Sequence, residues 1–439
     1  MKKTLRALAL GALTLLLSGC VFTGTETSLY RLPKLSGEYE SLEARLDELL
    51  DGGAAYAAPT SGSNLQSVQM VDLDGDGSEE AVAFLRRASD EKPMKIYIFK
   101  AVDDSYEQYA VIEGTAASIY SVNYSDLNGD GRRELLVGYK SSSDVQGFAV
   151  YPLAEGRLTP LLVTGYSRYA NLDLDGDGRQ ELLIIYSNEE GEACADHYGW
   201  DGAQLRVQGT LRLSMAVAEL SRLTVGTLAG GERALFVTGV TADSMTVTDV
   251  LTLRGGRLQN IALGPEGTKI PAATPFLGLY PGEGSDGVTE VPEAVPLQGS
   301  SRAGETLCCV VWLRFDIDGG TEETRTSFHN VADGWDLTLP EEWNREELSA
   351  ERVSGGGETS VSFYRTDGDG SRRRLLTVYR LTGELREELA QVGGRFTLTR
   401  QIEATFAAEL GEEWNVALDE QTLRERFSLI VAEWNAGDD

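Results

Sequence analysis

Residues 72–84 read DLDGDGSEEAVAF, and closely similar stretches recur as DLNGDGRRELLVG at residues 126–138 and DLDGDGRQELLII at residues 173–185. Each copy has Asp or Asn at loop positions one, three and five, glycine at four and six, and glutamate at nine. Oxygen atoms spaced by two residues can converge on a hard cation when glycines let the backbone curl around it. The pattern therefore predicts a metal-binding loop, with Ca²⁺ as its ion.

The loop belongs to a longer repeat. The glycines at loop position six are Gly77, Gly131 and Gly178, and weaker copies follow at Gly231 and Gly287. Each period holds several β-type apolar runs, and about four antiparallel strands at a period near 50 residues are typical of a propeller blade. We therefore expect a mainly β fold, a β-propeller of about five four-stranded blades, followed by a small α+β domain.

An EF-hand is excluded, because that motif needs a bidentate glutamate at loop position twelve and a helix after it. Position twelve is Ala83, Val137 or Ile184 in the three loops, inside a β-type run. A turn rich in Asp and Asn that holds no ion is the remaining alternative. It is disfavoured, since three or four acidic groups that converge without a cation repel one another.

The repeat resembles the FG-GAP/VCBS repeats of integrin-like propellers over about residues 60–330. In that family the loop joins the first two strands of a blade, and its side chains hold calcium. The resemblance implies these side-chain ligands: Asp72, Asp74, Asp76 and Glu80; Asp126, Asn128, Asp130 and Glu134; Asp173, Asp175, Asp177 and Glu181. It also implies main-chain carbonyl ligands at Ser78, Arg132 and Arg179. The family usually has Asp at position nine, where this chain has Glu. Asn128 removes one charge, so we expect the second loop to bind calcium most weakly.

The first twenty residues predict a lipoprotein signal peptide. Lys2, Lys3 and Arg6 precede an apolar run at residues 8–17 that is too short to span a membrane. The run ends in Leu-Ser-Gly-Cys, which resembles the lipobox of bacterial lipoproteins, and this resemblance implies lipidation at Cys20. Residues 21–37 then form a polar tether. We expect an extracytoplasmic protein that is held to the bacterial cell membrane by its lipid anchor alone.

The remaining boundaries follow from composition and period. Residues 38–60 hold an amphipathic N-terminal helix and a lead-in, residues 61–332 the repeats, and residues 333–439 the α+β domain, with a helix expected at residues 423–434. The chain has 39 Lys and Arg against 69 Asp and Glu, a net charge of −30. This balance argues against nucleic acid and anionic lipid as partners. Cys194, Cys308 and Cys309 are expected to be small packing residues.

No nucleophile elbow, HExxH, Walker loop or strand-borne GxGxxG is present, and the two histidines, His197 and His329, are interpreted as isolated polar side chains. We therefore expect a non-enzymatic scaffold that binds a protein or glycan ligand. An extracellular glycan-processing enzyme is the first alternative, because a catalytic carboxylate pair can be hidden among so many acids. An accessory subunit of an envelope complex is the second.

Overall fold

The computed structural model describes residues 37–430 apart from 104, 141–145, 203, 264–272, 277, 298–306 and 412–418. The predicted signal peptide with Cys20, and residues 21–36 of the tether, lie outside the described residues. None of the described helices has both the length and the apolar composition to cross a membrane.

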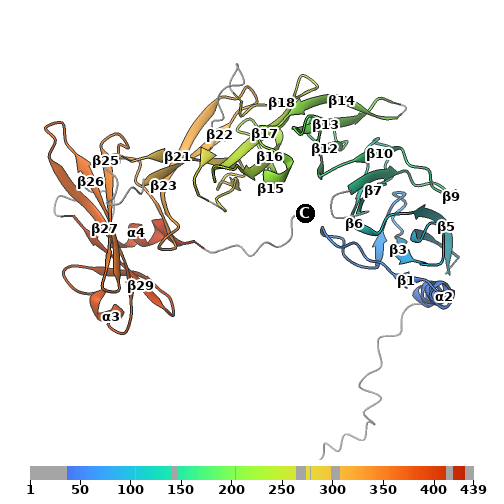
Figure 1. The fold of residues 1–439 in the computed structure, drawn as a ribbon, viewed down its shortest axis with the longest axis horizontal. Coiled ribbons are helices and arrows are strands. Elements are labelled where there is room, and N and C mark those ends of the chain that lie inside the picture. The colour runs from blue at the N-terminus through green and yellow to red at the C-terminus, as the bar shows by residue number, and fades with distance from the viewer. Residues whose placement is uncertain are drawn as a thin grey trace, which may run out of the picture.

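The fold is mainly β, as expected, and four successive sheets are antiparallel meanders that follow the sequence repeat (Figure 1). The first sheet contains β2 (Val68–Val71), β3 (Glu80–Arg86), β4 (Met94–Val102) and β5 (Ser105–Gly114), with β1 (Ala55–Tyr56) and β9 (Gly156–Arg157) at its edges. The second contains β6 (Ser118–Ser125), β7 (Glu134–Lys140), β8 (Gln146–Tyr151) and β10 (Leu162–Gly165). The third contains β11 (Arg168–Leu172), β12 (Glu181–Ser187), β13 (Ala193–Trp200) and β14 (Leu205–Arg212).

The fourth sheet contains β15 (Leu220–Thr227), β16 (Arg233–Val240), β17 (Thr246–Arg254), β18 (Arg257–Asn260) and the short β19 (Ala273–Thr274), and the 3₁₀ turn η2 (Val217–Glu219) precedes it. The fifth runs through β20 (Gly282–Glu283), β21 (Thr289–Pro296), β22 (Cys308–Phe315), β23 (Thr321–Asn330), β24 (Trp335–Thr338) and β30 (Phe427–Leu429). The sixth contains β25 (Leu348–Gly355), β26 (Glu358–Thr366), β27 (Arg372–Thr382), β29 (Ala404–Leu410) and β28 (Phe396–Arg400). Each repeat thus supplies one sheet.

The second strand of each meander is buried on both faces, which explains its continuous apolar run. In the third sheet, Leu183 and Ile185 face a core shared with the fourth sheet. Their neighbours Leu182 and Ile184 face a core shared with the second sheet. Because successive strand side chains point to opposite faces, an apolar run without alternation is what a sheet between two other sheets requires.

The first sheet has no sheet before it, and a helix covers its outer face instead. Helix α2 (Gly37–Asp51) places Leu42 and Leu46 against Ala81 and Ala83 of β3. This helix is the amphipathic element that the sequence predicts within residues 38–60, and it begins one residue before that range, at Gly37.

The sheets follow one another along an open arc, and the expected closed propeller ring is not formed (Figure 1). The first and fifth sheets lie apart, and no described strand of the fifth sheet pairs with the first. The free edge of β23 is used by β24 instead, and β24 in turn pairs with β30 near the end of the described chain. The fifth sheet therefore continues toward the C-terminal part rather than back to the start, and the expected boundary at residue 333 falls inside this sheet.

The C-terminal part packs the sixth sheet on the end of the fifth. Phe363 and Phe406 of the sixth sheet share a core with Trp335 and Phe427 of the fifth. Helix α3 (Arg386–Leu389) is a single short turn. Helix α4 (Glu420–Arg426) is capped by Asp419, whose carboxylate accepts a hydrogen bond from the Thr422 N–H at 2.8 Å.

The helix expected at residues 423–434 was predicted too long. It ends at Arg426, and β30 begins at Phe427. The side chain of Phe427 packs in the core from a strand that pairs with β24, and this pairing outweighs the helical spacing of the apolar residues. Residues 431–439 lie outside the described part.

Candidate functional site

Each acidic loop joins the first two strands of its sheet. Loop 1 (residues 72–80) connects β2 to β3, loop 2 (residues 126–134) connects β6 to β7, and loop 3 (residues 173–181) connects β11 to β12. The final glutamate of each loop is already the first residue of the second strand. The strand therefore fixes this side chain, while the preceding turn brings the other acids toward it.

The three loops share one hydrogen-bond pattern. In loop 1 the Asp72 carboxylate accepts hydrogen bonds from the Gly75 N–H at 2.8 Å and the Gly77 N–H at 3.1 Å. Glu80 Oε2 accepts one from the Leu73 N–H at 2.8 Å. Loops 2 and 3 repeat these bonds within 2.7–2.9 Å, at Asp126 with Glu134 and at Asp173 with Glu181. The acids at positions one and nine thus both stabilise the turn by accepting hydrogen bonds from its backbone N–H groups.

The glycines at positions four and six are required by the backbone. Gly75 and Gly77 have φ values of 74° and 88°, and the corresponding glycines of the other two loops have φ values of 75–87°. This left-handed region disfavours residues with a Cβ. Glycine at positions four and six therefore lets the turn bring the side chains of positions one and three toward the glutamate at position nine.

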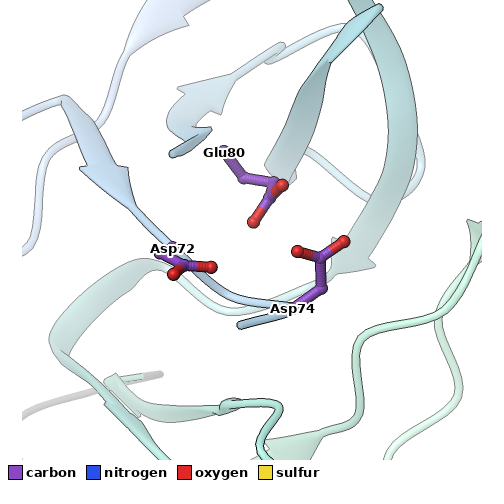
Figure 2. A group of neighbouring side chains, drawn as sticks. All are labelled: Asp72, Asp74 and Glu80. Carbon is purple, nitrogen blue, oxygen red and sulfur yellow. The ribbon is translucent and has the colours of Figure 1, made fainter. Parts of the chain in front are cut away.

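Three of the four predicted carboxylates come together in each of loops 1 and 3, and the position-five residues Asp76 and Asp177 are not part of these groups. One oxygen from each of Asp72, Asp74 and Glu80 lies within 4.8 Å of the others, and the same holds for Asp173, Asp175 and Glu181. Figure 2 shows the three side chains of loop 1 arranged around one space, with Glu80 entering from the start of β3. An all-oxygen donor set of this kind suits a hard cation such as Ca²⁺.

Glu80 is fully buried, and its Oε1 atom has no hydrogen-bond partner. A buried carboxylate oxygen without a partner is costly, and a bound cation would satisfy it. Burial raises the pKa of Glu80, and it raises the pKa of Glu134 and Glu181 to about 7 in each case. The neighbouring loop aspartates add to the rise in both, so the site without an ion favours protonated glutamates.

Loop 1 contains a cation of its own that sequence reasoning missed. The ammonium group of Lys100 on β4 bonds to Asp74, lies 3.3 Å from Asp76 Oδ2 and lies 3.8 Å from Glu80 Oε1. Lys100 comes 20 residues after the loop, and only the pairing of β4 with β3 brings it there. No local pattern in the sequence marks this contact.

Loop 2 differs at its third position. The Asn128 side chain donates a hydrogen bond to Glu134 Oε1 at 3.2 Å, and thus partners the glutamate oxygen that is unpartnered in loop 1. The smaller number of carboxylates in loop 2 agrees with the reasoning behind its weaker predicted site. The relative affinity of the three loops stays a prediction.

The predicted carbonyl ligands lie at the far side of each turn. The backbone N–H groups of Ser78, Arg132 and Arg179 donate hydrogen bonds to the position-five aspartates at 2.8–2.9 Å. Arg179 also forms an ion pair with Asp177 at 2.7 Å. The role of the three carbonyls as ligands stays a prediction.

Successive loops touch one another. The Arg133 N–H in loop 2 donates to the Leu73 carbonyl in loop 1 at 2.7 Å, and the Gln180 N–H in loop 3 donates to the Asp126 carbonyl in loop 2 at 3.4 Å. A Cβ on Gly75 would lie 2.5 Å from the Gly131 carbonyl oxygen. The three loops therefore form one continuous row along the ends of three sheets.

The weaker fourth and fifth copies keep the turn without the acidic set. Gly231 lies between β15 and β16, and Gly287 lies between β20 and β21, both with positive φ. Asp286 and Glu290 of the fifth copy pair with Arg314. Cys194, Cys308 and Cys309 are buried and form no disulfide with one another, as expected of packing residues.

No protein-family model matches the chain, and no curated protein matches it either. Among solved structures it is similar to an exotype rhamnogalacturonan lyase, YesX, at 12% identity and a TM-score of 0.26, over 73% of this chain and 72% of the other. It is also similar to a Bacillus licheniformis rhamnogalacturonan lyase at 13% identity and a TM-score of 0.30, over 73% of this chain and 71% of the other.

At TM-scores this low, the likeness assigns neither a fold nor an activity to this chain. Both similar proteins are nevertheless named as enzymes. The expectation that the chain is non-enzymatic is contradicted by this finding, and we withdraw it.

Proposed function

We infer that the chain is a lipid-anchored, extracytoplasmic protein whose acidic loops bind Ca²⁺, and that the row of ion-filled loops stiffens a β-sheet scaffold that binds a protein or glycan ligand. The observation that carries the calcium proposal is the convergence of buried Glu80 and Glu181 with two aspartates each. The resemblance of the repeats to FG-GAP/VCBS repeats supports the same ion.

The location of the loops explains why an ion would matter beyond its own turn. Each ion would neutralise three or four acids that otherwise repel one another. Since each loop touches the next, holding one turn rigid also fixes the contact between neighbouring sheets. Sites in extracellular modules bind calcium at about 10⁻⁴ to 10⁻³ M, and we place these sites in that range.

Thermal unfolding with and without CaCl₂ tests the calcium proposal. We expect Asp72→Ala, Asp126→Ala and Asp173→Ala each to lose part of the calcium-dependent rise in Tm, with Asp126→Ala losing the least. Asp286→Ala in the acid-poor fifth copy is the control, and its calcium response should match that of the wild type. Equal calcium responses in all four variants would rule out binding at the loops.

Glycan processing is the second candidate function. The two similar structures are rhamnogalacturonan lyases, and their names supply the substrate to try first. The test incubates the mature protein with rhamnogalacturonan in CaCl₂ and measures new unsaturated chain ends by absorbance. If a variant lacking all three position-one aspartates still cleaves the substrate, the catalytic residues lie outside the loops. If this variant is inactive, catalysis depends on the ions bound in the loops.

A further inference from the structure

Loop 3 borders a cavity to which the proposed calcium sites assign no role. The cavity has a volume of about 390 Å³ and lies where the end of the third sheet meets the hairpin between β17 and β18. Its wall includes Asp175, Glu181, His197, Trp200, Gln208 and Gly256. This volume falls in the range of small-molecule sites, roughly 300–1,000 Å³.

His197 supplies an independent sign of a ligand. Only 5% of its surface is exposed, yet both ring nitrogens lack a hydrogen-bond partner. Buried polar side chains nearly always have partners, so an unpartnered histidine in a cavity wall points to a group that is bound there. Burial lowers the pKa of His197, and the charge of Asp175 opposes this only partly. The neutral ring offers one N–H donor and one acceptor lone pair.

The cavity exists because of one residue that differs between equivalent sheets. Tyr198 pairs with Leu182 in the third sheet, as Phe99 pairs with Ala81 in the first. Gly199 therefore occupies the place that Lys100 holds beside loop 1. A Cβ on Gly199 would lie 3.2 Å from Gln208 Cγ and 3.8 Å from His197 Nε2. Glycine thus leaves open beside loop 3 the space that a lysine fills beside loop 1.

The charges around the cavity limit what can enter. Asp175, Asp177 and Glu181 line it, and Arg179 is already paired with Asp177. Asp201 adds another carboxylate and is paired with Arg206 at 3.0 Å. Four loop acids outweigh one bound Ca²⁺ and the charge of Arg179, so this wall stays negative in the calcium-bound protein and disfavours anionic ligands. A purely apolar ligand would leave His197 without a hydrogen bond.

A neutral, hydroxyl-rich ligand satisfies these groups together. A sugar hydroxyl can either accept a hydrogen bond from the N–H of the histidine ring or donate one to its unprotonated nitrogen, and the Gln208 amide can likewise donate from its NH₂ or accept at its oxygen. Trp200 is partly buried and offers a flat apolar ring with an N–H donor. We propose that the cavity beside loop 3 binds one unit of a neutral saccharide through His197, Gln208 and Trp200. This proposal rests on the glycan-binding form of the function proposed above.

Histidine NMR tests the proposal directly, because His197 and His329 are the two histidines of the chain. The protein is labelled with ¹³C at the histidine rings and titrated with D-galactose and D-glucose in CaCl₂. We expect a saturable shift of the His197 signal with at least one neutral sugar. The His329 signal is the internal control. It should not shift, because the His329 ring does not line the cavity and is hydrogen-bonded to Asp336, with 3.0 Å between Nδ1 and Oδ2.

Two variants and two charged probes sharpen the result. Gly199→Leu fills the cavity and should abolish the shift, whereas Gln208→Ala leaves the fold intact and should weaken binding about fivefold, the value of one hydrogen bond. D-Galacturonate and D-glucuronate should bind more weakly than their neutral counterparts. A His197 signal that no neutral sugar moves, or tighter binding of either acid, would overturn the proposal.

The same samples separate this proposal from the calcium proposal. The Tm of each sample is measured with and without CaCl₂. If calcium raises the Tm and the neutral sugars leave His197 unmoved, the saccharide site is wrong and the calcium scaffold stands. If calcium does not raise the Tm, the calcium proposal fails whatever the sugars do.

Discussion

Lys100 places a positive charge beside loop 1. The corresponding strand position beside loop 3 is Gly199, which carries no charge. The ammonium group of Lys100 contacts three loop acids and therefore neutralises part of their charge, as a bound ion would. Calcium and this lysine compete for the same carboxylates. In loop 1 the lysine therefore offsets part of the negative charge when no ion is bound.

Lys100→Met tests this role. Without calcium the variant should lose about 1.5–3 kcal/mol of unfolding free energy, the usual worth of hydrogen bonds to charged groups. With calcium the loss should shrink, because the ion can occupy the vacated space. Urea unfolding in EGTA and in CaCl₂ measures both values.

Lys95→Met is the matched control for this change. Lys95 is on the same strand and pairs with Asp90 and Glu113, away from the loop. Its loss of stability should be the same in EGTA and in CaCl₂. If Lys100→Met also showed no calcium dependence, the idea that the lysine stands in for an ion would be refuted.

The glutamates at position nine make calcium binding depend on pH. The pKa of Glu134 and of Glu181 rises from 4.5 to about 7 in the ion-free fold. The fold then holds more protons than the unfolded chain between these values, so the calcium-free protein loses stability as pH rises through this window. Calcium needs the carboxylate form and releases the protons.

We therefore expect the calcium-dependent rise in Tm to grow between pH 5.5 and pH 8, with protons released on binding. Calorimetric titrations in two buffers of different ionisation enthalpy count the released protons. Glu181→Gln should lower this count, since it removes one titrating group. A calcium response that is flat over this pH range would contradict the assignment of the glutamates as ligands.

At the level of single residues, the sequence predicts what is local. The acids, glycines and glutamate of each loop lie within nine residues, so their convergence follows from turn geometry alone. Lys100 and His197 reach the loops through the pairing of later strands, and their register is not written in a short pattern. The sequence alone therefore identifies the loops but not their neighbours.

At the level of elements, the hydrogen bonds between successive loops link neighbouring sheets, and the sequence did not predict this link. Gly75 lies at the contact between loops 1 and 2, whereas a Cβ on Gly77 would meet nothing within 4 Å. Both glycines have positive φ. They differ in this one contact and form a matched pair for mutation.

Gly77→Ala should cost about 1–2 kcal/mol through its left-handed backbone alone. Gly75→Ala should cost a further 1–3 kcal/mol or so, because its Cβ forces the loops apart. Chemical unfolding of both variants in CaCl₂ measures the difference. Equal losses would show that the contact between the loops contributes nothing to stability.

Strands were easier to predict than the C-terminal helix. Residues 81–85 of β3 and 182–185 of β12 are continuous apolar runs of the β type, and the structure buries both runs on both faces. Leu423 and Phe427 have helical spacing, yet the chain leaves the helix between them. The pairing of Phe427 with Leu337 comes from an element about 90 residues earlier, which spacing cannot reveal.

For the whole molecule, the repeat predicted successive sheets but not how they end. Five sheets at the repeat period were consistent with a closed ring. Closure needs the outer face of the last sheet to pack on the outer face of the first, but α2 covers that face of the first sheet and the sixth sheet covers that face of the fifth. The result is an open arc, in which the contacts between neighbouring sheets alone hold the shape (Figure 1).

An open arc with a net charge of −30 is exposed to its own repulsion. Ions bound along the row of loops would relieve this repulsion where the sheets meet. Calcium should therefore act on the contacts between sheets and not only within single turns.

Amide hydrogen exchange with and without calcium tests this account most directly. Calcium should slow exchange at residues 72–80, 126–134 and 173–181, including the interloop donors Arg133 and Gln180, while the sixth sheet stays unchanged. Identical exchange at all three loops in EGTA and in CaCl₂ would contradict it.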